Sequence, residues 1–376
     1  MEGSPLGEQR VVSKLPESIA KKTLRGMKKA RKQAQRGAKL ARYVAGRVRS
    51  AEKSLYFHLR DTRAGQVLLR VATLAGGGRE LRGRRQVAST YTRTMGDPLI
   101  DPAKGWGAVS FDPASPEFRG VLATSRRLFE IKQAKIAEQM KGFDGWSPEK
   151  QAKFLQRKQS FYRHLLKDED LRRNPDLVEF ALSEQMLGPV TQYLGMVPYL
   201  TRVDLVYSVS RGTDEKIESQ LFHLDHEGLR QVKYFIYVYD VDEPEGPFTF
   251  LPADTSFRVV NDVRAWRKRH AGGGDVESRR YLDNEITAVN AAQDIVAVKG
   301  PAGSGVAVDT SRCLHLGSRC RPGAFRLVLY LQYCTTRELT NVYDVDRFRN
   351  DPVKYLAVSH SVEPGRAHAD HYEMAG

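Results

Sequence analysis

The chain has 376 residues, a formal net charge of +15 at pH 7 and a hydrophobic fraction of 41%. This length can bury a full core, and the hydrophobic fraction is ordinary for a globular protein. No uninterrupted apolar run approaches 18 residues, so no transmembrane segment is expected, and the N-terminus lacks the apolar core of a signal peptide. The cysteines cannot all pair within the chain, which favours a reducing, cytoplasmic location. They are Cys313, Cys320 and Cys334.

The first predicted element is a basic helical arm over residues 1–55. Residues 1–50 contain 14 Lys and Arg against three Asp and Glu. From residue 18 onward, small apolar side chains recur every three or four positions, which predicts a helix whose alanine-rich face buries little area. Two interpretations stay open: a solvated arm, or contact with an anionic membrane surface that would make the protein peripheral there. Nucleic acid is not expected as a partner, because no fold for base readout accompanies the arm.

Residues 56–175 form a mixed and largely helical region that we expect to flank the core. Short β-like runs and glycine-rich turns precede helical signals that begin near Pro116. Ser147 followed by Pro148 is typical of a helix N-cap with proline at the first helical position. We therefore expect helices over the second half of this region.

Residues 176–345 carry the predicted core. It opens with a helix whose apolar face ends at Gly195, and from Thr201 the hydrophobic period changes to two, which is typical of strands. The expected strands are 202–208, 219–225, 232–239, 248–251, 294–299, 305–309 and 325–334. Many short strands separated by turns predict a jelly roll or related barrel, in a fold that is mainly β with flanking helices (α+β).

Two other segments are predicted from their composition. Residues 256–290 form a polar insertion with many basic residues. It is either a solvated loop or an electrostatic lure for an anionic substrate, such as a phosphate- or carboxylate-bearing lipid, glycan or thioester. Residues 346–376 are expected to form a C-terminal tail.

One His-x-Asp pair and one distant histidine stand out within the predicted strands. His223 and Asp225 are two residues apart, so in a strand their side chains share a face, and His315 follows Asp225 by ninety residues. Two histidines and one carboxylate are the ligand set that holds Fe(II) and leaves positions for co-substrate and oxygen. A second His-x-Asp pair at 368–370 lies in the polar tail and is not expected to bind metal. Cys313 is interpreted as a small buried residue rather than a ligand.

A series of motifs surrounds these three residues in a fixed order. They are His223-Leu224-Asp225, 233–237, 240–242, 246–252 and 309–317, with Arg326 eleven residues after His315. Their order and spacing, over roughly residues 176–340, resemble the phytanoyl-CoA dioxygenase family. The resemblance implies a double-stranded β-helix, cupin-like in type, with Fe(II) and with 2-oxoglutarate and O2 as co-substrates. Residues 252–255 depart from the family pattern, which bears on loop geometry away from the ligands.

Family members chelate iron with the keto acid end of 2-oxoglutarate, so the other carboxylate needs a buried cation. Arg326 fits this role, because it interrupts an apolar run and its planar guanidinium matches a carboxylate. Arg321 is the rival, although it adjoins a Pro-Gly turn. By analogy with the family, Lys233 and Tyr237 face inward and line the co-substrate pocket. The alternative, a strand face with a solvated lysine, stays open.

These residues together predict an Fe(II)/2-oxoglutarate-dependent dioxygenase that hydroxylates a C–H bond of an anionic small molecule, lipid or glycan. A halogenase would give up the carboxylate ligand, and Asp225 argues against it. One alternative is a non-catalytic barrel recruited to acidic partners by its basic arm, which would tolerate loss of Asp225 or Arg326. Another is a zinc or metal-independent cupin-like isomerase, which would not need Arg326.

Overall fold

The computed structural model describes residues 78–225, 230–270, 278–336 and 343–359. The chain divides into two compact units after Gly78, and the second unit contains the core. The predicted arm and the second His-x-Asp pair lie outside the described residues, so the interpretations given to them stay predictions. Among the described helices, none is both long and apolar enough to cross a membrane.

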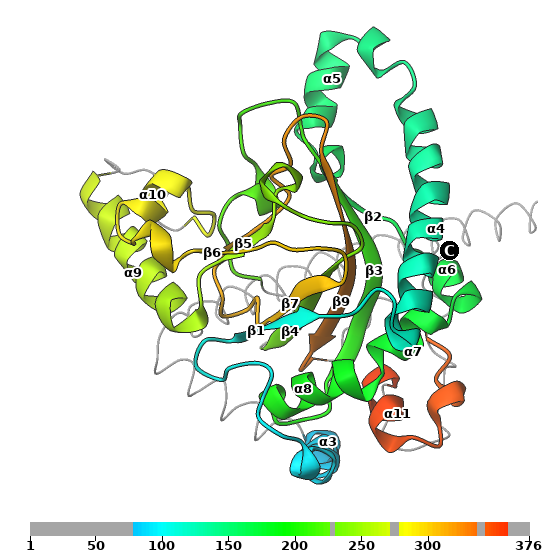
Figure 1. Ribbon diagram of the computed structural model, residues 1–376. Helices are drawn as coiled ribbons and strands as arrows, with labels where there is room; N and C mark the ends of the chain where they lie inside the picture. The colour runs from blue at the N-terminus through cyan, green and yellow to red at the C-terminus, as the bar shows by residue number, and fades with distance from the viewer. Residues whose placement is uncertain (1–77, 226–229, 271–277, 337–342, 360–376) are drawn as a thin grey trace, which may run out of the picture. The chain divides into compact units, whose positions relative to one another are not determined.

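The larger of two sheets has six antiparallel strands in the order β1-β7-β4-β9-β3-β2 (Figure 1). The strands are β1 (Trp106–Ser110), β2 (Tyr162–His164), β3 (Tyr199–Val209), β4 (Gln231–Tyr237), β7 (Ser304–Val308) and β9 (Phe325–Cys334). β4 and β9 are buried along nearly their whole length. The sheet takes its two edge strands, β1 and β2, from the region that the sequence indicated only as a flank.

The smaller sheet has the strand order β6-β5-β8. Its strands are β5 (Phe248–Phe250), β6 (Val296–Val298) and β8 (His315–Leu316). A bridge between His223 and His315 adds residues 222–223 to its edge. The two sheets pack face to face, because Phe235 of β4 stacks on Phe248 of β5 with ring centroids 4.1 Å apart.

The order of the strands along the chain defines the fold. From β3 onward the extended segments alternate between the two sheets, except that β5 and β6 follow one another in the smaller sheet. The strands β3, β4, β7 and β9 belong to the larger sheet, and residues 222–223, β5, β6 and β8 to the smaller. This winding is a double-stranded β-helix of the jelly-roll type. The predicted class, a β core with flanking helices, is therefore confirmed.

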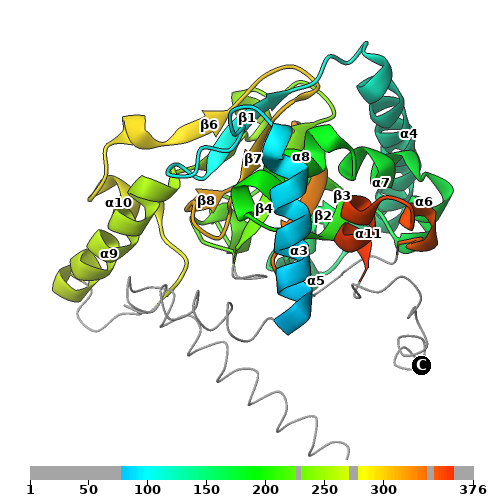
Figure 2. The same cartoon turned by 90° about the horizontal axis from the view of Figure 1, so that it is seen from below.

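Helices cover the outer face of the larger sheet, where they share one hydrophobic cluster with β3, β4 and β9 (Figures 1 and 2). They are α3 (Gly78–Tyr91), α4 (Pro116–Met140), α7 (Asp176–Ala181), α8 (Glu184–Leu194) and α11 (Pro352–Val358). The single helix expected from residue 176 is two helices, since Ser183 adopts extended backbone as the N-cap of α8. Gly195 ends α8 in the left-handed region, as the sequence indicated.

The remaining helices lie at the rim of the barrel. They are α5 (Pro148–Leu155), α6 (Asp168–Arg173), α9 (Ala253–His270) and α10 (Asp283–Thr287). Short 3-10 turns are η1 (Thr92–Thr94), η2 (Phe143–Gly145), η3 (Lys158–Ser160), η4 (Glu218–Gln220), η5 (Glu243–Glu245), η6 (Ala292–Asp294) and η7 (Asp346–Phe348). Ser147 caps α5 as expected, because its side chain accepts a hydrogen bond from the amide of Lys150.

Two segments are more ordered than the sequence indicated. The basic insertion contains α9 and α10, and Arg267 is buried between them with two hydrogen bonds to Glu285, of 2.7 and 2.6 Å. The predicted C-terminal tail begins with η7 and α11, and α11 buries Leu356 against the core. Both segments contain apolar residues at helical spacing. The many charged residues beside them made this pattern hard to recognise in the sequence.

Candidate active site

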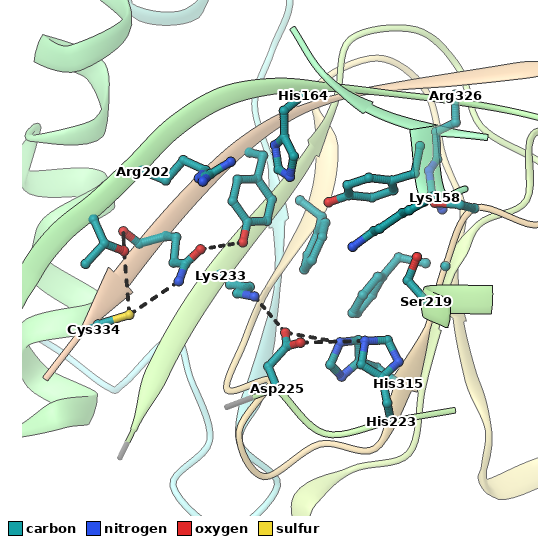
Figure 3. Close-up of a pocket in the computed structure, with 18 residues that line it drawn as sticks. Lys158, His164, Arg202, Ser219, His223, Asp225, Lys233, His315, Arg326 and Cys334 are labelled. Carbon is teal, nitrogen blue, oxygen red and sulfur yellow. Dashed lines mark hydrogen bonds and ion pairs between the residues drawn. The ribbon is translucent and has the colours of Figure 1, made fainter. Parts of the chain in front are cut away.

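The two sheets enclose a cavity of about 180 Å³ that contains both predicted histidine ligands (Figure 3). His223 and His315 are placed by a reciprocal backbone pair, in which each amide donates to the carbonyl of the other at 2.9 Å. The His223 Nδ1 lies 2.8 Å from the carbonyl of Leu221, and the His315 Nδ1 lies 2.9 Å from that of Cys313. A neutral imidazole that donates from Nδ1 leaves Nε2 as the ligand atom.

Asp225 completes the group. Its backbone amide donates to the carbonyl of Thr310 at 2.9 Å, which fixes the chain beside the two histidines. The His223 Nε2 lies 3.6 Å from Asp225 Oδ1, and the His315 Nε2 lies 3.3 Å from Asp225 Oδ2. One ligand atom from each of the three residues lies within 4.8 Å of the others. The structure therefore brings together all three residues that the sequence indicated, with a donor set that suits Fe(II).

The electrostatics of the cavity favour the charge states that a metal requires. Burial, reinforced by the neighbouring His315, lowers the pKa of His223 well below its ordinary value. Burial alone would raise the pKa of Asp225, but Lys233 and His315 outweigh it and hold that pKa well below its usual range. The group thus consists of a neutral imidazole and a carboxylate at neutral pH, which are the forms that bind metal.

Lys233 lies inside the cavity. Its side chain comes from β4, is only 4% exposed, and donates from Nζ to Asp225 Oδ2 at 2.7 Å. The alternative of a solvated lysine on an outer strand face is therefore wrong. Lys233 neutralises the carboxylate within the buried cavity.

Arg326 is the most unusual side chain of the cavity. It is 3% exposed, and its Nη1 donates to the carbonyl of Gly246, but its buried Nε has no hydrogen-bond partner. No acidic side chain among the described residues forms an ion pair with it. A desolvated charge without a counterion is costly, so an anion bound in the cavity beside Arg326 would be stabilised.

Two glycines lie beside Arg326: Gly246 lets the backbone of 319–320 pack against the carbonyl that Arg326 contacts, and Gly317 leaves space for the guanidinium. Gly246 has φ of 67°, and a Cβ there would lie 2.5 Å from the backbone carbon of Arg319. A Cβ on Gly317 would lie 3.1 Å from Arg326 Nη2. The rival Arg321 is exposed, does not line the cavity, and its amide donates to the carbonyl of Pro244. The Gly-Pro and His-Leu-Gly motifs thus shape the surroundings of this guanidinium.

Tyr237 does not line the cavity. Its hydroxyl donates to the carbonyl of Val298 at 2.6 Å and accepts from the amide of Phe248 at 3.1 Å. The side chain is fully buried between the two sheets. Tyr237 therefore faces inward as expected, but it bridges β4, β5 and β6 and does not line the cavity as a co-substrate contact would.

Sequence reasoning missed one wall of the cavity. Lys158, Tyr162 and His164 line it from η3 and β2. Figure 3 shows His164 across the cavity from the His-Asp-His group. The His164 Nδ1 lies 2.8 Å from Asp204 Oδ2, which fixes its ring. The only signal was the aromatic run that begins at Phe161, because a three-residue strand has no measurable period.

A polar network closes the cavity at the end of β9. The Tyr330 hydroxyl donates to Gln332 Oε1 at 2.6 Å, and Gln332 Nε2 lies 3.5 Å from the Cys334 sulfur. The opposite side is aromatic, with Phe235 and Phe248 stacked beside His315. One side of the cavity can therefore orient polar groups of a ligand, while the other excludes water.

The sequence matches no family model. No curated protein matches it. Among solved structures, the epimerase SnoN in complex with Fe3+, alpha ketoglutarate and nogalamycin RO is 14% identical, with 66% of this chain and 83% of that chain covered and a TM-score of 0.37. HygX from Streptomyces hygroscopicus with nickel and 2-oxoglutarate bound is 13% identical, covering 64% and 89%, with a TM-score of 0.35. EctD from S. alaskensis with 2-oxoglutarate and 5-hydroxyectoine is 12% identical, covering 65% and 85%, with a TM-score of 0.38.

Proposed function

We propose that this chain is an Fe(II)- and 2-oxoglutarate-dependent dioxygenase that hydroxylates a C–H bond of a small organic substrate. The observation that carries the proposal is the pairing, in one cavity, of a buried His-Asp-His group with a buried arginine that lacks a counterion. A metal site alone would not need Arg326, and an anion site alone would not need the three ligands. A co-substrate with a chelating end and a carboxylate end uses both.

The three ligands would be His223, Asp225 and His315, and Arg326 would pair with the distal carboxylate of 2-oxoglutarate through its planar fork. When bound, Fe(II) with 2-oxoglutarate supplies the oxidation of an unactivated C–H bond by O2, with succinate and CO2 as co-products.

Lys233 has a separate role in this proposal. It holds Asp225 as a carboxylate and lies on the cavity side of β4. The stacked rings of Phe235 and Phe248 keep water away from the reacting position. The chain itself therefore binds, orients and desolvates, while the oxidising power comes from the cofactors.

The order of motifs supports a relation to the phytanoyl-CoA dioxygenase family in particular. An anionic small molecule, lipid or glycan is the substrate class that we propose, and contact of residues 1–50 with an anionic membrane surface belongs to the same proposal. The alternative of a non-catalytic barrel gives no reason for an uncompensated buried arginine beside three metal ligands.

A binding experiment without oxygen tests the proposal. Titration of 2-oxoglutarate into the Fe(II)-loaded chain should show one site, and the affinity should fall when the metal is removed. The His315→Ala and Arg326→Leu variants should each weaken binding at least about tenfold, since each removes a charge-assisted contact. Unchanged 2-oxoglutarate affinity in both variants would reject the proposed co-substrate. Succinate formation in oxygen then screens substrates.

A further inference from the structure

A second cavity, of about 650 Å³, adjoins the first. The two share Lys158, Tyr162 and His164 as lining residues. The outer cavity is completed by residues of α4 and α6, which stand beside β2 and β3 in Figure 1. β2 is an edge strand of the larger sheet, so the two cavities meet at that edge.

Successive side chains of β2 point to opposite faces of the strand, so the strand contributes to both cavities. Tyr162 and His164 line the inner cavity, whereas Arg163 between them lines only the outer one and reaches Met140 of α4, with Nη2 3.6 Å from its sulfur. A ligand that passes Tyr162 and His164 therefore enters the space bounded by Arg163.

The inner cavity is too small for a complete substrate. Pockets for drug-sized ligands have volumes of about 300–1,000 Å³, whereas the inner cavity has about 180 Å³. In the proposed reaction it must also hold 2-oxoglutarate beside Arg326. Only the reacting part of a substrate then fits inside, and the remainder has room in the outer cavity.

The outer cavity is strongly basic. It is lined by six Lys and Arg side chains and two acids. Both acids are engaged, because Asp170 pairs with Lys132 at 2.6 Å and Glu169 pairs with Arg173. The cations left over form no ion pair with an acidic side chain in the described part of the chain. They are Lys135, Lys158, Arg163 and Lys167.

We propose that the outer cavity binds an anionic group of the substrate, phosphate or carboxylate, while the adjoining carbon chain passes β2 to reach the His-Asp-His group. This inference rests on the proposed function and adds the place and the charge of the substrate's distal group. The four cations supply the countercharge, and Lys158, which lines both cavities, lies at their junction.

The basic insertion, which the sequence favoured for this role, is placed differently. Figures 1 and 2 show α9 and α10 on the side of the barrel opposite α4. Arg267 of α9 is already bonded to Glu285, and none of the described residues of the insertion (256–270 and 278–290) lines either cavity.

The test uses two triple variants with the same change in net charge. Lys135→Gln, Arg163→Gln and Lys167→Gln remove outer-cavity cations, of which Lys135 and Lys167 are exposed and Arg163 is half-buried. Arg119→Gln, Lys268→Gln and Arg269→Gln remove exposed cations that line neither cavity. The probes are hexyl phosphate, hexanoate and uncharged hexanol, titrated calorimetrically into the full chain with Fe(II) and 2-oxoglutarate and without oxygen.

The outer-cavity variant should bind the anionic probes about tenfold more weakly than the unmodified chain, since each surface charge contributes a modest amount. The control variant should stay within about twofold, and hexanol should be unaffected by either change. Tighter binding of hexyl phosphate than hexanoate identifies phosphate as the group, and the reverse identifies carboxylate. Equal loss in both triple variants, or no loss in the outer-cavity variant, overturns the inference. 2-Oxoglutarate binding is measured in the same samples. A chain that binds no 2-oxoglutarate would contradict the proposed function, and this result is separate from the binding of the probes.

Discussion

The two walls of the inner cavity are held in different ways. On one wall, His223 and His315 face each other across reciprocal backbone hydrogen bonds, and each ring is fixed by a carbonyl of its own chain segment. The other wall is β2, a strand of three residues at a sheet edge, paired only with β3. The first wall is thus fixed by the barrel itself, whereas the second can vary in sequence without disturbing it. In the proposed function, the first wall holds the metal and the second wall contacts the substrate.

The largest effect is expected from a substitution in the first wall. His315→Ala should lower iron affinity at least about a hundredfold and abolish succinate formation, because even residues that only support a ligand cost about 10–100-fold when lost. Metal content after gel filtration in Fe(II) is the measurement. His164→Ala on the second wall is the matched control and should keep its iron. If the two variants lose equal amounts of iron, the division between the walls is wrong.

The second largest effect is expected from Arg326→Leu. The variant should bind 2-oxoglutarate about tenfold to a hundredfold more weakly, since a charge-assisted pair is lost, while folding survives because an uncompensated buried charge has been removed. Arg326→Lys should recover little of the affinity, because an ammonium lacks the planar fork. Arg321→Leu serves as the control. A larger effect of the change at Arg321 than at Arg326 would move the carboxylate site to the turn.

Lys233→Met should show itself in the pH dependence of stability. Burial raises the pKa of Asp225, and Lys233, together with His315 and His223, more than offsets that rise. A lowered carboxyl pKa contributes stability above the unfolded value of about 3.9, and this stability is lost as pH falls through the folded pKa. Without the ammonium the folded pKa rises, so the metal-free variant should have its largest loss of stability near neutral pH and should lose less further stability than the unmodified chain as pH falls.

Near neutral pH, Lys233→Met should lower the free energy of unfolding by about 3 kcal/mol, because the buried Asp225 carboxylate has lost its main partner. Melting temperatures of the metal-free chain across pH give the measurement. Adding Asp225→Asn to Lys233→Met should remove most of the deficit near neutral pH, because no buried carboxylate is then left without its partner. A pH profile of Lys233→Met that overlays the unmodified profile would show that the pair does not control Asp225.

The same division explains what the sequence could predict. The strand expected over residues 325–334 has the same bounds as β9. Arg326 was identified because it is a charged residue within an apolar run. The expected strand 219–225 survives only as the bridge at 222–223, because the ligands sit where the chain leaves the sheet.

What the sequence could not predict depends on contacts between distant segments. β2 exists because β3 offers it an edge, and its three residues carry no period of their own. Arg267 was counted as a solvated charge, although Glu285 neutralises it in the interior. Tyr237 shares a strand with Lys233, yet its hydroxyl is taken up by the backbone of β5 and β6.

The smallest effect is expected from deletion of residues 1–50. The predicted arm has an alanine-rich face too small to belong to a core, so Fe(II) and 2-oxoglutarate affinities should stay within about twofold. If the arm contacts anionic membranes, co-sedimentation with anionic vesicles should fall on deletion. The difference should shrink as salt rises, because exposed charges are screened beyond about 8 Å at physiological ionic strength. Equal vesicle binding of both forms at low salt would reject this contact. Loss of folded protein on deletion would show instead that the arm packs on the barrel.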